Sequence, residues 1–563
     1  MGVPGFFLWL SKKAKLLKLK EQLILKRIID PEKVGDSLDY KEINSEKLDN
    51  LNYSKDIDWF LIDTNCLIHP VCFKVLAETD EDISNSRLED KMMIAVIDYI
   101  EWLIDFVSPK KGVYLAIDGV APAAKMKQQR YRRFTSVYMK NLEMNIRKKH
   151  GKEQKRFWNN SAVTPGTEFM ERLHHKLMNW LKNKERGIKV IYSSCKTPSE
   201  GEHKLLQFIR DNKKENKIYK YVVYGLDADL IFLSLASNNP NVYLLREAQE
   251  LDKKNCANEL NYVSIDFMKQ FIFDIVKSII SHKNIDLRMS DGDDEEENEG
   301  SKSEHNEINI TDDKIDNVIK DFIFICYLLG NDFVPHLESI NIYDGGIDFL
   351  LEQYSELLIS NGFSSFIVKQ SGHEIITHSI NQRMFTELIS LIASEESENL
   401  KNAYVSKRRK HRCPSSDPFE QEMFKIENLD FKIEDPIMLG SDESELWKKR
   451  YYLHYYKKLV NSDEETYNNH VSSMVEEYIK GLKWITRYYF DGCPSWNWFY
   501  RFDYPPFLED IRDFLITKKD FSIKNLKFKI SKPLRPFNQL LLVLPPQSSF
   551  LVPKMLRPLM NDP

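Results

Sequence analysis

The chain has few of the features that mark membrane-spanning or secreted proteins. None of its apolar runs approaches the roughly 20 residues that a helix needs to cross a bilayer. Its first residues lack the basic-then-apolar order of a secretory signal. The seven cysteines are scattered and include no Cys-x-x-Cys pair, which argues against a disulfide framework and a thiolate zinc site. We therefore expect an intracellular protein without a membrane partner, with a cytoplasmic location favoured and a nuclear one left open.

Net charge is small but unevenly distributed. The chain of 563 residues carries a formal charge of −5. The run 291–299 alone holds seven acids, so the rest of the chain is positive, and we expect this run to lie in a solvated insertion at about 283–312. The stretch 125–156, by contrast, holds twelve Lys or Arg residues against two Glu. Such a surplus is typical of a surface that binds nucleic-acid phosphates, because each contact releases counterions.

Short apolar runs alternate with stretches of helical periodicity in the first half of the chain. This order predicts an α/β fold, in which helices cover a parallel sheet. Expected strands lie at 59–62, 113–117, 190–192 and 221–224, and expected helices at 92–106, 169–181 and 202–209. Composition loosens at about 394–420, which predicts a linker or an insertion. Beyond about 440 the chain is helical in pattern and rich in aromatic residues.

Carboxylates follow the apolar runs in a repeated pattern. In a parallel sheet, residues just past the carboxyl ends of the strands line the ligand-binding crevice. The acids in these positions or at an expected helix start are Asp63, Asp118, Glu200, Glu202, Asp227, Asp229 and Asp332. Each acid alone could cap a helix, but the pairs spaced by two residues would repel each other without a cation between them. Oxygen ligands favour Mg²⁺ or Mn²⁺, and a pair of such ions suits phosphodiester hydrolysis.

A basic helix is expected directly after Asp118, because Pro122 suits a first helical turn. At about 100° per residue, Lys125, Gln129, Arg132 and Arg133 fall on one side of this helix. Three cations and an amide could bind a terminal phosphate. The alternative is a generic basic helix that slides along backbone phosphates.

Ordered motifs along the chain resemble those of the Xrn-type 5′-to-3′ exoribonucleases. They are Met1–Pro4 with Phe6-Phe7, Asp63–His69, Asp118–Arg130, Thr164–Met170, Ser199–Lys204, Gly225–Asp229, Leu329–Phe333, Gly481–Trp484, Ser495–Tyr500 and Leu542–Pro545. The set covers nearly the whole chain. Any one motif is only moderately specific for this family, whereas the complete set in this order is very specific for it.

This resemblance implies a PIN/flap-nuclease-like twisted parallel sheet flanked by helices, with a helical, aromatic-rich C-terminal segment. The expected divisions are a nuclease core at 1–350, a helical connection and linker at 351–435, and a second block at 436–563 that packs on the core. The expected enzyme is a monomeric short form, without the C-terminal modules of the large cytoplasmic members. It would hydrolyse single-stranded RNA with a 5′-monophosphate to nucleoside monophosphates, with Mg²⁺ or Mn²⁺ as cofactor.

The resemblance also assigns roles to residues. The seven acids become metal ligands, and Lys125, Gln129, Arg132 and Arg133 become the 5′-phosphate pocket. Asn65 lies beside the metal site, and the first base stacks between His69 and Trp496, with Trp498 as the alternative. Two residues depart from the family pattern: Ala123 stands where an arginine is common, and Asp503 replaces a histidine, and both changes bear on affinity for the 5′ end. The competing functions are a flap-type DNA endonuclease and an RNA-binding scaffold without catalysis.

Overall fold

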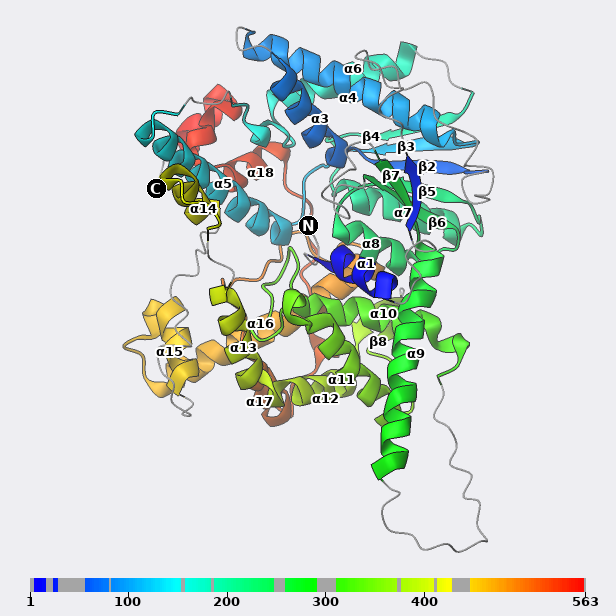
Figure 1. Cartoon of the computed structure of the whole chain (residues 1–563), viewed down its shortest axis with the longest axis vertical. Helices are drawn as coiled ribbons and strands as arrows, with labels where there is room; N and C mark the ends of the chain where they lie inside the picture. The colour runs from blue at the N-terminus through cyan, green and yellow to red at the C-terminus, as the bar shows by residue number, and fades with distance from the viewer. Residues whose placement is uncertain are drawn as a thin grey trace, which may run out of the picture.

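The fold was analysed in a computed structural model of the chain (Figure 1). It describes residues 5–16, 24–28, 56–79, 83–152, 157–183, 187–247, 259–290, 310–371, 376–409, 413–427 and 446–560. The acidic run 291–299 therefore lies outside the described residues, as do the last residues of the basic stretch, 153–156.

A seven-stranded sheet forms the centre of the N-terminal half. Its strands are β1 (Ile24–Ile28), β2 (Trp59–Asp63), β3 (Gly112–Ala116), β4 (Lys189–Ser193), β5 (Tyr221–Tyr224), β6 (Val242–Glu247) and β7 (Glu259–Ser264). They lie in the order β1-β7-β6-β5-β2-β3-β4. The five strands from β6 to β4 are mutually parallel, whereas β7 and β1 are antiparallel to their neighbours. The predicted parallel sheet is thus confirmed, and two antiparallel strands extend it.

Alternate residues of the central strands enter two different cores. Phe60 and Ile62 of β2 face the core beneath α3, α4 and α6, whereas Trp59 and Leu61 face the core that contains α7 and α8. Because side chains alternate along a strand, one five-residue segment serves both faces. Figure 1 shows these two helical layers on either side of the sheet. The α/β fold class is confirmed.

Helices make up most of the remaining structure. In the N-terminal half they are α1 (Phe6–Leu16), α3 (Thr64–Glu78), α4 (Asn85–Val107), α5 (Ala123–Lys149), α6 (Glu168–Asn183), α7 (Gly201–Lys214), α8 (Ala228–Ser237) and α9 (Ile265–Ser290). The later ones are α10 (Ile315–Cys326), α11 (Gly346–Ser360), α12 (Gln382–Ser394), α13 (Glu396–Arg409), α14 (Pro418–Glu427), α15 (Leu446–Tyr455), α16 (Glu464–Phe490), α17 (Leu508–Thr517) and α18 (Pro536–Val543). A hairpin of β8 (Ile367–Ser371) and β9 (Ile376–Ile380) lies among them.

Two sequence expectations differ from this structure. The stretch at about 394–420 was expected to be a linker or an insertion of loose composition, but α13 and α14 occupy much of it. Polar composition gave a misleading signal there, because a helix with an exposed surface is also polar. The apolar run before Asp332 is not a strand either. It forms the end of α10 and the short 3₁₀ turn Tyr327–Leu329.

The C-terminal helices share a core with the sheet. Trp484 of α16 is fully buried, and its ring lies 5.1 Å from that of Phe333, which follows the Asp332 turn. Residues of α8, α10 and α16 belong to one continuous hydrophobic cluster. Among the described helices, none has both the length and the apolar character that a membrane span requires.

Candidate active site

Three of the predicted acids occupy the position just before a helix. Asp63 ends β2 and precedes α3, Glu200 precedes α7, and Asp227 precedes α8. Asp63 accepts a capping hydrogen bond from the Asn65 N–H at 3.2 Å. The Glu200 and Asp227 side chains make no capping hydrogen bond. Helix capping therefore does not explain why these two positions are acidic.

The seven acids converge from separate segments of the chain. Five of them are buried, whereas Asp118 and Asp227 are half-buried. Burial and the nearby Asp118 charge raise the pKa of Asp63 to about 8. Burial also raises the pKa of Glu202 and of Asp229, which lie close enough to repel one another. The negative charge of Glu200 acts to raise the pKa of Asp118, that of Asp227 acts to raise the pKa of Glu202, and that of Asp332 acts to raise the pKa of Asp229. Each of the seven acids therefore lies close enough to at least one other to repel it.

Backbone groups bring the acids of different segments into contact. The Gly201 N–H donates to Asp118 Oδ1 at 2.6 Å, and the Asn65 side-chain oxygen accepts from the Asp118 N–H at 3.0 Å. A Cβ atom at Gly201 would lie 2.7 Å from Asp63 Oδ1. Only glycine allows the start of α7 to approach Asp63 this closely. Asn65 thus lies beside Asp63 and Asp118.

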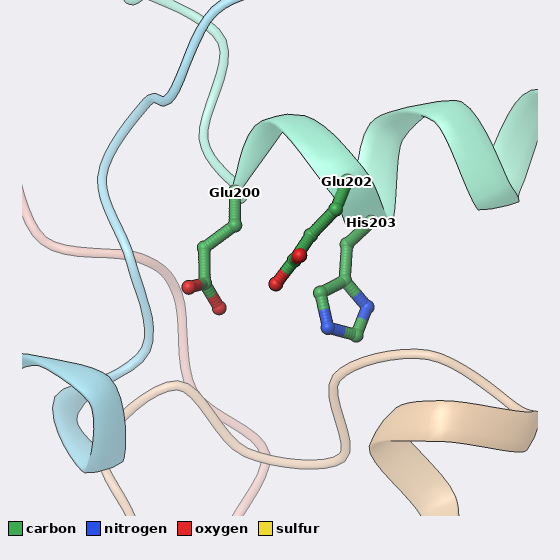
Figure 2. Close-up of side chains that lie close together, drawn as sticks. All are labelled: Glu200, Glu202 and His203. Carbon is green, nitrogen blue, oxygen red and sulfur yellow. The ribbon is translucent and has the colours of Figure 1, made fainter. Parts of the chain in front are cut away.

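Figure 2 shows Glu200, Glu202 and His203 projecting to the same side of the first turn of α7. Ligand atoms of these three buried residues lie within 4.8 Å of one another. Among the described residues, Glu202 Oε2 is buried without a hydrogen-bond partner. A buried carboxylate oxygen without a donor is costly unless a cation faces it. The donor set therefore fits a divalent cation. The sequence pointed to both acids but not to His203, although it directly follows them.

Lys125 lies among the acids. Its Nζ is 2.6 Å from Glu200 Oε1 and 2.6 Å from Asp332 Oδ2. Burial alone would raise the pKa of Asp332, but the nearby positive charges, that of Lys125 foremost, together outweigh burial, so the pKa lies below its usual value. Helical spacing predicted the side of α5 on which Lys125 lies. It did not predict that Lys125 pairs with Glu200 and Asp332, which belong to other segments of the chain.

Arg132 and Arg133 lie near His69. Burial, followed by the charges of these two arginines, lowers the pKa of His69 to about 4. Arg133 donates through Nη2 to Thr164 Oγ1 at 2.9 Å, while its Nη1 is buried without a partner among the described residues. A buried guanidinium N–H aimed away from any acceptor suits an anionic ligand. Gln129 accepts from Gln539 Nε2 at 3.2 Å, a contact that the sequence did not indicate.

The loop with the predicted stacking tryptophan meets the start of α5. The Ala123 N–H donates to the Trp496 carbonyl at 2.8 Å, and Lys127 Nζ donates to the Tyr500 carbonyl at 3.0 Å. Trp498 is half-buried and packs against the core, with its ring 5.4 Å from that of Trp484. Asp503, which departs from the family pattern, pairs with Lys127 at 3.2 Å.

Two tyrosines of α16 also reach the acid cluster. Tyr488 donates to Glu200 Oε2 at 3.0 Å, and Tyr489 donates to Asp229 Oδ1 at 2.9 Å. The sequence showed only that this segment is aromatic. Nothing in a single sequence distinguishes tyrosines that contact acids from those that fill a core.

Comparison with known proteins agrees with this geometry. A family model described as the XRN 5′-3′ exonuclease N-terminus matches residues 1–248, and one described as the Xrn1 helical domain matches 312–429 and 378–563. The 5′-3′ exoribonuclease 2 of Candida albicans is 27% identical over an alignment that covers the whole chain and 68% of that relative. The 5′-3′ exoribonuclease 1 of Homo sapiens is 29% identical, with 31% of its length covered.

The 5′-3′ exoribonuclease 2 of Arabidopsis thaliana is 28% identical over the whole chain and 63% of its own length. The chain thus spans between about a third and about two thirds of the length of these relatives. The two family models together match most of the chain, in the order of the motifs. This chain therefore belongs to the Xrn family of 5′-3′ exonucleases.

Proposed function

We propose that this protein is a 5′-to-3′ exoribonuclease that hydrolyses 5′-monophosphorylated, single-stranded RNA to nucleoside monophosphates. The observation that carries the proposal is the position of α5. This helix begins five residues after Asp118, so a cationic surface starts directly beside the buried acids. The names of the related proteins support RNA as the substrate class.

The seven acids would hold one or two divalent cations, with Mg²⁺ or Mn²⁺ favoured by the oxygen donors. Such ions activate a water molecule and stabilise charge on the leaving oxygen. His203 adds a nitrogen donor beside Glu200 and Glu202. Burial lowers the pKa of His203 well below its usual value, which keeps its imidazole neutral.

Directionality would come from the phosphate pocket near Arg132, Arg133 and Gln129. Water attacks the second phosphorus atom of the RNA, and the bond to the 3′ oxygen of the first nucleotide breaks. That oxygen takes up a proton, and the first nucleotide leaves with its 5′-phosphate. The shortened RNA then carries a new 5′-monophosphate, so the same pocket can bind it again. His69 and Trp496 would stack on the first base, which tolerates any sequence.

The direct test compares one RNA with a 5′-phosphate, a 5′-hydroxyl or a 5′-triphosphate end. With Mg²⁺ or Mn²⁺ present, we expect rapid release of nucleoside monophosphates from the RNA with a 5′-phosphate only. With a chelator, we expect no release from any of the three RNAs. A labelled flap DNA in the same assay tests the endonuclease alternative, since its cleavage in preference to the RNA would contradict the proposal.

Replacing Glu202 by Gln tests catalysis separately from binding. The change keeps the side-chain volume but removes a charge at the buried oxygen that lacks a donor. We expect the rate of hydrolysis to fall by about a thousandfold, while RNA affinity changes little. Glu215→Gln, at the other end of the same helix, is the matched control and should retain activity. Hydrolysis at the normal rate by Glu202→Gln would mean that the chemistry does not need Glu202, whereas a parent protein that binds RNA without hydrolysing it would favour the scaffold alternative.

A further inference from the structure

Adjacent tyrosines near the end of α16 contact two acids that belong to different elements. Tyr488 donates to Glu200 at the start of α7, and Tyr489 donates to Asp229 in the first turn of α8. Both tyrosines are only 2% exposed. Successive helical residues differ in direction by about 100°. One helix can therefore reach both parts of the cluster with neighbouring side chains.

Ring contacts fix the two tyrosines in place. The Tyr488 ring stacks on His203, with 3.7 Å between ring centroids and 28° between planes. The Tyr489 ring lies edge-on to the same imidazole at 6.0 Å and to Tyr327 at 5.3 Å. Arg210 of α7 also donates to the Tyr489 carbonyl. The end of α16 is thus attached to α7 by side-chain and backbone contacts.

A hydroxyl that donates to one carboxylate oxygen restricts rotation of the whole carboxylate. Glu200 illustrates this, because Oε2 accepts from Tyr488 while Oε1 faces Lys125. Residues that orient metal-binding side chains from behind contribute to metal affinity although they do not touch the ion.

We propose that Tyr488 and Tyr489 are positioning residues that orient Glu200 and Asp229 for binding of a divalent cation. The C-terminal half of the chain thereby sets the metal affinity of a site whose acids all lie in its first 332 residues. This inference rests on the proposed metal-dependent function and adds residues to it that are not themselves metal ligands.

The test is equilibrium binding of Mn²⁺ to the full chain without RNA, followed by the electron paramagnetic resonance signal of free Mn²⁺. Tyr488→Phe and Tyr489→Phe remove the hydroxyls but keep the rings. Each change should weaken Mn²⁺ binding by about tenfold. In RNA hydrolysis, each should lower kcat at limiting metal, with recovery at high metal concentration and an unchanged KM for RNA.

Tyr354→Phe is the matched control. Tyr354 is also fully buried and donates to a buried carboxylate, Asp321 Oδ2, at 3.0 Å, but Asp321 is not one of the seven acids. It should lose thermal stability like the other variants and bind Mn²⁺ normally. The inference is overturned if the two test variants bind Mn²⁺ as tightly as the parent or more tightly, or if Tyr354→Phe weakens binding equally. If the parent itself binds no Mn²⁺, the proposed function fails instead.

Discussion

The charge of His69 depends on its neighbours. Burial and the charges of Arg132 and Arg133 lower its pKa to about 4, so its imidazole is neutral at physiological pH. In the proposed function, a neutral ring suits stacking on a base and adds no charge to the predicted phosphate pocket. In the proposed function the two arginines would therefore have two effects: they would offer cations to a terminal phosphate, and together with burial they lower the pKa of the nearby histidine.

Arg132→Ala should reduce the preference for 5′-phosphate over 5′-hydroxyl RNA by about 10- to 100-fold, since hydrogen bonds between charged groups are the stronger kind. The measurement is the ratio of kcat/KM for the two RNAs. Arg130→Ala is the control, because Arg130 lies on the same helix but donates to the Leu542 carbonyl at 2.6 Å. An unchanged ratio in Arg132→Ala would place the 5′-phosphate elsewhere.

Sequence patterns indicated the acids better than their surroundings. The positions after strands predicted Asp63 and Asp227, because the carboxyl ends of parallel strands meet at one edge. Asp332 was assigned to the same group because it follows an apolar run, but that run ends in a 3₁₀ turn and is not a strand. Asp332 therefore lies near the other acids for a reason that the strand pattern did not capture. Periodicity placed Lys125 on the correct helix, but its partners Glu200 and Asp332 depend on how distant segments pack. Tertiary contacts of this kind leave no local signal.

At the scale of elements, a buried aspartate connects α10 to α11 and β8. Asp321 is 1% exposed and accepts hydrogen bonds from Tyr354 Oη at 3.0 Å, Ser365 Oγ at 2.7 Å and the Ile367 N–H at 3.0 Å. Burial raises its pKa from the ordinary 3.8 to about 7, although these hydrogen bonds act to lower it. No lysine or arginine contributes to this shift among its principal causes.

This raised pKa makes stability depend on pH. Between about pH 4 and pH 7 the folded protein holds a proton that the unfolded chain has released, so the free energy of unfolding should fall as pH rises through this window. Asp321→Asn cannot ionise, so the fall across the window should be smaller by up to about 4 kcal/mol. Urea unfolding of the parent and of Asp321→Asn at several pH values measures the free energy of unfolding and its change with pH.

Asp316→Asn, an exposed change on the same helix, controls for the loss of a negative charge and should leave the pH dependence of the parent intact. If Asp321→Asn shows the same dependence as the parent, then Asp321 is ionised in the folded protein at pH values well below 7.

At the scale of the whole molecule, α18 packs against the segment that follows Asp118. Gln539 of α18 is 1% exposed and accepts from the Ala121 N–H at 3.1 Å, across 418 positions of sequence. Its Nε2 donates to Gln129 at 3.2 Å. Val120 and Met126 pack with Leu540 and Val543 of the same helix. The end of the chain thus supports both the Asp118 loop and the predicted phosphate pocket.

Gln539→Met keeps a similar volume but leaves the buried Ala121 N–H without its acceptor, which should cost about 1–3 kcal/mol of stability. Gln129 also loses its partner, so the preference for 5′-phosphate over 5′-hydroxyl RNA should fall several-fold. Gln382→Met is the matched control, because Gln382 likewise accepts from a backbone N–H, that of Ile523, at 2.9 Å and lies in α12. Both variants should lose stability in thermal melts, but only Gln539→Met should change the ratio of kcat/KM for the two RNAs. Equal ratios in both variants would mean that α18 supports the fold without shaping recognition of the 5′ end.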